Sequence, residues 1–382
     1  MRRSVVLATV FLLLGAAAFA DWEAGVAAFR KGDFNTALRE FRVVAEQSPT
    51  YAGAHYMLGL TLQRLHRDDE ALRSLQDAHR LEPTNPQYAV ATARAFLDAK
   101  RPQDAERAMR AVRAEGLPAQ QRQLVLATQA QIAMATGDDS RGMTLLQQAT
   151  QVDPRNAEVW AQYGLVLSRA DKNREAFDAF RRSWDLNQNE SVGKNACAAG
   201  IRAARLTRTD NERRDLYRQV AALATKIYEK KASAETALLV GEAFLGAADF
   251  NSALTWFDRT GVESALVLFY KGQAYSSLDQ YGRAEEHLRR AVERQPDPNL
   301  RRQIYNSLGY VLDKSRKYVE AARAYQEAGN SAKVAEMRDK EAKAQQNIKA
   351  DEEDRQKREL ERLAREFDDI TRRGGSPTPR PQ

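Results

Sequence analysis

Small and apolar residues recur along the first third of the chain at a fixed interval of 34 residues. Three aligned series carry this period: Ala37, Ala71 and Ala105; Gly25, Gly59 and Ala93; and Phe41, Leu75 and Met109. The large residue of each copy follows the alanine by four positions, which places both on one face of an α-helix. One period has room for two helices and a turn, and this interval is typical of a solenoid of stacked helix pairs.

The most complete copy has six residues in a pattern that one known family uses: Trp160, Tyr163, Gly164, Leu167, Ala176 and Phe180. It resembles the tetratricopeptide (TPR) repeat, whose pattern is W-x2-L-G-x2-Y, then A-x3-F, then proline. Gly164 and Ala176 are small because the two helices of the repeat approach closely there, and large residues fill the volume around that contact. The resemblance implies an all-α TPR superhelical solenoid.

Further copies extend the solenoid over most of the chain. Full copies surround Gly241, Gly272 and Gly309, and a degenerate copy contains Ala130 and Gly142. Prolines are expected to end four of the second helices, because proline lacks the amide donor and clashes with the preceding turn: Pro49, Pro83, Pro154 and Pro296. Residues 191–231 lack the motif but have room for a helix pair with a turn near residues 207–210. We therefore expect about nine helix pairs within residues 21–330.

The first 20 residues have the features of a secretory signal peptide. Two arginines follow Met1, residues 5–18 are apolar, and Ala18 and Ala20 form a small-x-small cleavage site before Asp21. The alternative is an uncleaved anchor, although the apolar run is shorter than the roughly 20 residues of a typical membrane span. We expect cleavage after Ala20, no membrane span in the remaining chain, and a periplasmic location.

Composition and motifs favour binding over catalysis. Lys and Arg number 59 against 52 Asp and Glu, and this small surplus is spread along the chain, so we expect no nucleic-acid partner. The four histidines lack the spacing of a metalloprotease helix, and no nucleophile or phosphate-binding motif occurs. We therefore expect no cofactor and no metal. Cys197, the only cysteine, stands among alanines and is predicted to be buried in a helix.

The TPR resemblance also implies a binding groove. In TPR arrays the first helix of each repeat lines the concave face, and the repeat register assigns seven positions to it: Trp22, Val26, Phe29, Tyr56, Leu60, Val90 and Arg94. Aromatic anchors in a concave site are typical of binding hot spots, so we predict that a protein or peptide partner binds here. The alternative is that Trp22 and Phe29 cap the solenoid, since a first repeat has no preceding neighbour.

Charge dominates after the repeats. Residues 331–373 are predicted to form one long, charged helix, and residues 374–382 a disordered tail. Near the end of this helix an apolar stripe follows spacings of three, four and three: Leu360, Leu363, Phe367 and Ile370. The stripe covers only about two heptads, which is short for a stable coiled coil. We expect it to dock on a partner or on the solenoid rather than to join two copies; the oligomeric state is left open.

Three function hypotheses follow. The first is a non-catalytic periplasmic scaffold that holds a protein segment in its groove, in an envelope assembly, secretion or pilus complex. The second is an accessory subunit of envelope polysaccharide synthesis or export, with the groove around a glycan or a synthase. An enzyme with a divergent site is the third and weakest hypothesis.

Overall fold

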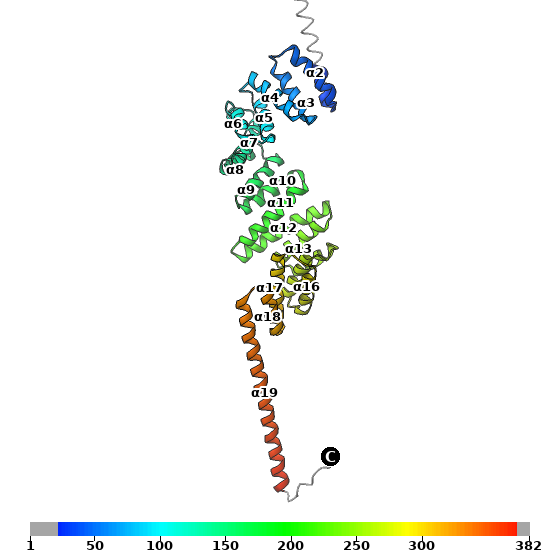
Figure 1. Ribbon diagram of the computed structural model, residues 1–382, viewed down its shortest axis with the longest axis vertical. Helices are drawn as coiled ribbons and strands as arrows, with labels where there is room; N and C mark the ends of the chain where they lie inside the picture. The colour runs from blue at the N-terminus through cyan, green and yellow to red at the C-terminus, as the bar shows by residue number, and fades with distance from the viewer. Residues whose placement is uncertain (1–21, 373–382) are drawn as a thin grey trace, which may run out of the picture. The chain divides into compact units, whose positions relative to one another are not determined.

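The computed structural model describes residues 22–372, so the predicted signal peptide and the tail after residue 373 lie outside the described residues. Within that range every regular element is a helix, most of them α-helices in pairs, as expected for an all-α solenoid (Figure 1). Contacts divide the chain into two compact units at Thr207 and Arg208, a division that the repeat pattern does not indicate.

The first unit begins with a helix over residues 22–31 and continues with ten further helices. These are α2 (Phe34–Gln47), α3 (Ala52–Arg64), α4 (Asp68–Leu81), α5 (Pro86–Asp98), α6 (Pro102–Met109), α7 (Ala119–Ala135), α8 (Asp139–Val152), α9 (Ala157–Arg169), α10 (Asn173–Asn187) and α11 (Glu190–Leu206). α2, α4 and α8 each end two residues before a proline, which confirms the predicted stops at Pro49, Pro83 and Pro154.

The second unit contains the remaining helices: α12 (Asp210–Lys230), α13 (Ala234–Gly246), α14 (Phe250–Arg259), α15 (Ala265–Ser277), α16 (Tyr281–Glu293), α17 (Pro298–Lys314), α18 (Tyr318–Glu327) and α19 (Ser331–Arg372). α11 packs on α10 in the first unit, and α12 packs on α13 in the second. The helix pair expected over residues 191–231 is therefore divided between the units, at the turn predicted near residues 207–210.

The close approach of paired helices depends on the small residues that the repeat places there. A Cβ added to Gly164 would lie 2.6 Å from the Phe180 ring, and one added to Gly59 would lie 2.6 Å from Leu75. Ala176 is fully buried, as predicted. The same small–large pairing recurs in the second unit, where Gly272 faces Leu288 at 2.7 Å. In both units, then, the glycine admits the large side chain of its partner helix.

A left-handed residue joins the two helices of many repeats. Gly32, His66 and Lys100 have φ of 80°, 56° and 57°, and they stand 34 residues apart. In the second unit, Ala248 occupies the corresponding turn before α14 with φ of 64°. This conformation costs an L-residue about 1–2 kcal/mol because its Cβ approaches the backbone, so glycine suits the position best.

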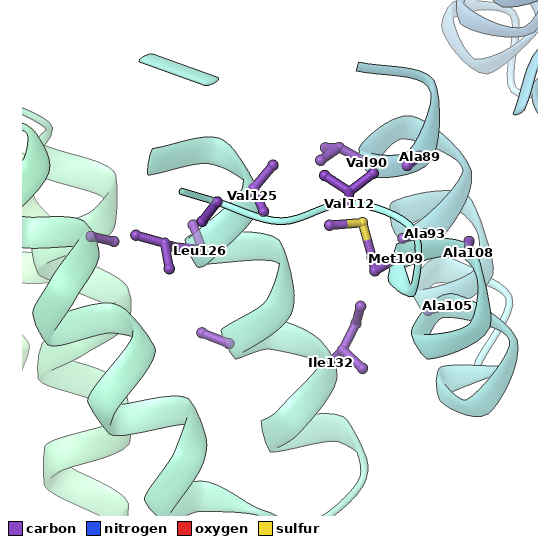
Figure 2. Packing of buried hydrophobic residues seen from close by; sticks show 14 of the residues in the cluster. Ala89, Val90, Ala93, Ala105, Ala108, Met109, Val112, Val125, Leu126 and Ile132 are labelled. Atoms are coloured by element: carbon purple, nitrogen blue, oxygen red, sulfur yellow. The ribbon is translucent and has the colours of Figure 1, made fainter. Parts of the chain in front are cut away.

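One hydrophobic cluster continues from α5 through to α9 (Figure 2). α6 is only eight residues long, and the non-helical link that follows it carries Val112, which is 5% exposed and packs with Val90 and Met109. In the degenerate repeat the small residues exchange places: Ala130 is fully buried where other repeats have glycine, and Gly142 faces Met134. Val112 in the link after α6, together with the exchanged Ala130 and Gly142, keeps the core filled where the 34-residue interval is interrupted.

α19 has two different halves. Its beginning packs on α18: Met337 is fully buried, and Lys340 donates to Asp313 of α17 at 2.7 Å. From residue 345 to 369 every side chain is exposed. The first half therefore closes the second unit, and the second half has no contact that would bury it within the described part of the chain.

Candidate interaction groove

A pocket of about 640 Å³ lies along the first helices of successive repeats in the first unit. Its lining includes five of the seven predicted groove residues: Phe29, Tyr56, Leu60, Val90 and Arg94. They come from the helix over residues 22–31, from α3 and from α5, at equivalent positions around each repeat glycine or alanine. The structure thus brings together side chains that lie up to 65 positions apart in the sequence, from Phe29 to Arg94.

The pocket extends further than the register predicted. Seven additional residues line it: Gln63, Arg64, Asp68, Gln87, Ala91, Asp98 and Leu124. Most of them stand three or four positions from a predicted residue on the same helix, for example Gln63 after Leu60 and Asp98 after Arg94. Extending the helical spacing by one turn in each direction would have found them.

Aromatic rings and opposite charges meet in this groove. The Tyr56 ring lies 4.9 Å from that of Tyr88, and burial raises the pKa of the Tyr56 phenol, which stays neutral. Arg64 and Arg94 share the lining with Asp68 and Asp98. The Nε atom of Arg94 is buried and has no hydrogen-bond partner among the described residues.

Two predicted residues lie elsewhere. The Trp22 ring packs 5.4 Å from Phe41 and 5.2 Å from Tyr51, and Val26 packs against the same cluster; neither lines the pocket. Val90, although it lines the pocket, is only 3% exposed and belongs mainly to the core. These placements favour the end-cap interpretation for Trp22. Phe29 both packs on Phe34 and reaches the pocket.

A second groove lies in the second unit, and none of its residues was predicted from the sequence. This pocket of about 420 Å³ has a lining rich in amide and hydroxyl groups: Leu245, Phe250, Gly272, Gln273, Ser276, Ser277, Asn306, Ser307 and Tyr310. Applying the register around Gly241, Gly272 and Gly309 gives Leu245, Gln273, Ser276, Asn306 and Tyr310 at once. Asn306 is held in place: it donates to the Arg302 carbonyl at 3.0 Å and accepts from Asn330 at 3.1 Å.

The apolar stripe of α19 is open to solvent. Leu360, Leu363 and Phe367 are 67%, 50% and 57% exposed, so they do not dock on the described part of the solenoid; the side chain of Ile370 lies outside the described residues. A partner for the stripe stays a prediction. Leaving it exposed forgoes about 25 cal/mol for each square ångström of apolar surface that could be buried.

Other candidate chemistry is sparse in residues 22–372. No group of three His, Cys, Asp or Glu side chains within this range has the geometry of a metal site. No helix over the same residues has the length and apolar character that a bilayer crossing requires. Cys197 is fully buried, as predicted, and burial raises the pKa of its thiol to about 12, which keeps it protonated and unreactive.

These features define a helical-repeat protein whose concave surfaces can hold another molecule. A family model described as tetratricopeptide repeat matches the chain over residues 22–88, 56–120 and 270–335. The chain therefore contains tetratricopeptide repeats in both units, as the sequence pattern predicted. No curated protein matches the chain.

Similar solved structures are TPR proteins with low sequence identity. MamA residues 41–end from Desulfovibrio magneticus RS-1 is 19% identical, with a TM-score of 0.40 over 45% of this chain and 95% of that one. Pseudomonas aeruginosa PilF is 16% identical, with a TM-score of 0.45 over 63% and 98% of the two chains. YrrB, described as a TPR protein with an unusual peptide-binding site, is 15% identical, with a TM-score of 0.35 over 44% and 85%.

Proposed function

We propose that the chain is a non-catalytic scaffold that holds a segment of a partner protein in the groove of its first unit. The observation that carries this proposal is the 640 Å³ pocket that gathers Phe29, Tyr56, Leu60 and Arg94 from separate repeats. Rings and aliphatic side chains supply apolar contact area, whose removal from water is the main driving force of most protein–protein association. The oppositely charged groups on the same lining would fix the orientation of the segment.

We further propose that the scaffold works in the cell envelope, in an assembly, secretion or pilus complex. Its support is the basic start, the apolar run and the Ala-x-Ala site of the first 20 residues, which together favour export. Mass spectrometry of the protein isolated from cells tests this step. A mature N-terminus at Asp21 is expected, and intact Met1 in a cytoplasmic fraction would contradict it.

Site-specific photo-cross-linking tests the groove. A photoreactive phenylalanine at position 60 lies in the pocket, whereas one at position 182 lies on the exposed surface of α10, outside it. We expect a discrete cross-linked protein from position 60 alone, and its loss when Tyr56→Ala is added. Equal cross-linking from both positions would show that the groove is not the binding surface.

A glycan-binding accessory subunit is the second candidate. The observation in its favour is the groove of the second unit, where Gln273, Asn306 and Tyr310 combine hydrogen-bonding groups with an aromatic ring. Such a lining suits a neutral, hydroxyl-rich ligand better than a charged one. Binding of envelope polysaccharide fragments that is lost in Tyr310→Ala would support this function over the first.

A further inference from the structure

Another pocket of the first unit lies away from the groove, on the side formed by second helices. It has a volume of about 710 Å³, with walls from α4 and α6 and a floor that includes Thr92 and Phe96 of α5. Four arginines line it: Arg73, Arg80, Arg101 and Arg107. We refer to it as the arginine pocket. No motif or register position accounts for this concentration of guanidinium groups.

Positive charge exceeds negative charge within this pocket. Asp77 pairs with Arg80 at 2.9 Å, and Asp104 contacts both Arg101, at 2.6 Å, and Arg107. Among the described residues Arg73 has no ion pair, and its neighbour Glu70 is already bound by Arg67 at 2.6 Å. Four guanidinium groups against two carboxylates leave a formal charge of +2 on the lining.

Two arginines are held in position at α6: Arg101, its N-cap residue, and Arg107 within the helix. The Arg101 guanidinium lies 4.9 Å from the centre of the Phe96 ring, a cation–π contact, and its Nε donates to Asp104. The Asp104 carboxylate, whose side chain is 18% exposed, contacts both Arg101 and Arg107 and so limits their movement. Because these side chains are already held in place, less conformational entropy is lost when a ligand binds.

The other polar side chains of the lining contribute less to binding. His79 lines the wall, but its Nδ1 atom is buried out of reach of a ligand. The Thr92 hydroxyl is already bonded to the Leu75 carbonyl at 2.9 Å. The pocket therefore offers mainly guanidinium groups beside the Phe96 ring.

We propose that the arginine pocket binds an oxyanion group with two negative charges, either a phosphate or a pair of carboxylates, separately from the partner in the groove. Guanidinium groups match the geometry of both anions by paired N–H donors. Two negative charges neutralise the surplus of the lining. Phe96 and Ala108 accommodate the apolar part of the molecule that carries the anion.

Isothermal titration calorimetry on the purified full chain, in about 0.15 M salt so that surface charge is screened, tests this proposal. The probes are inorganic phosphate for a phosphate group and succinate for a pair of carboxylates. We expect one of them to bind with one-to-one stoichiometry, and the probe that binds identifies the chemistry. Arg73→Gln and Arg107→Gln should each weaken binding at least tenfold, or about 1.4 kcal/mol.

Arg182→Gln is the matched control, because Arg182 is exposed on α10 and lies outside the pocket. It should leave the affinity unchanged. Thermal unfolding of each variant shows that the fold is retained, which is expected because Arg73 and Arg107 are exposed at the surface. The proposal is overturned if neither anion binds, or if Arg182→Gln weakens binding as much as the pocket variants.

Discussion

The two grooves use the same scaffold positions for different chemistry. Positions three before, one after and four after the small residue of a repeat supply much of each groove lining, counted from Gly59 and Ala93 in the first unit and from Gly272 and Gly309 in the second. In the first unit these positions hold Tyr56, Leu60 and Arg94, whereas in the second they hold Gln273, Asn306 and Tyr310. The small–large contact between paired helices is alike in both. The repeat therefore determines which side chains face the groove. The residue types at those positions determine what the groove can bind.

If the two units share one scaffold, the same substitution should damage both. Gly59→Leu and Gly272→Leu each insert a side chain where even a Cβ would lie 2.6 or 2.7 Å from the facing leucine. We expect each variant to lose about 3 kcal/mol of unfolding free energy, the upper part of the range for overpacking. Chemical denaturation measures this loss.

Gly282→Ala is the control for those variants, since beyond its own stretch of helix backbone no atom lies within 4 Å of an added Cβ there. It should be neutral or stabilising by up to about 1 kcal/mol, because alanine favours the helix more than glycine does. A large loss at one of the two contact glycines and none at the other would show that the units are built differently.

At the N-terminal end of the first groove, a substitution of Trp22 can distinguish a packing role from a binding role. Trp22→Ala removes a ring that packs on Phe41 and Tyr51, so we expect a loss of about 2 kcal/mol in stability. Partner affinity should change less than twofold because Trp22 does not line the pocket. Thermal unfolding and a binding titration measure the two effects. Weakened binding with unchanged stability would restore Trp22 to the partner site.

The turn residues provide a smaller contrast between the units. Gly32 adopts φ of 80° without a side chain, whereas Ala248 adopts φ of 64° with one. Ala248→Gly should therefore raise stability by about 1 kcal/mol, since relief of the left-handed conformation outweighs the added freedom of the unfolded chain. Denaturant midpoints test this; Ala243→Gly, in a buried helical position of α13, should be destabilising instead.

Both grooves should be independent of the exposed half of α19. Deleting residues 351–382 removes only side chains that are exposed wherever the structure describes them, so stability should change by less than about 0.5 kcal/mol. We expect the shortened chain to remain monomeric and to assemble less well with its partner. Sedimentation of both forms checks this, and a dimer that dissociates on deletion would make the stripe an oligomerisation surface.

The sequence predicted the fold because the 34-residue interval constrains packing directly. Gly164 and Ala176 have their expected packing roles, helices end before Pro49, Pro83 and Pro154, and the residues that the register grouped as Tyr56, Leu60 and Arg94 line one pocket. What it missed depends on contacts between side chains that no interval encodes. The rings around Trp22 and the convergence of Arg101 and Arg107 on Asp104 are of this kind.

The division of the chain near Thr207 was also missed, although the loss of the motif over residues 191–231 lies at the same place. Because this segment lacks the repeat's packing residues, the sequence does not indicate which neighbouring helix each of its two helices packs against. The residues of the second groove, in contrast, could have been predicted from the sequence. Its residues follow the same register as the first, applied to Gly241, Gly272 and Gly309.

The most direct test of the account compares one aromatic residue from each groove. The partner protein identified by cross-linking is titrated against the unmodified chain, Tyr56→Ala and Tyr310→Ala by isothermal titration calorimetry. We predict that Tyr56→Ala weakens binding about 30-fold, or roughly 2 kcal/mol, as expected for a hot spot. Tyr310→Ala should change it less than twofold. Loss of binding in Tyr310→Ala with full affinity in Tyr56→Ala would contradict the assignment of the partner site to the first unit.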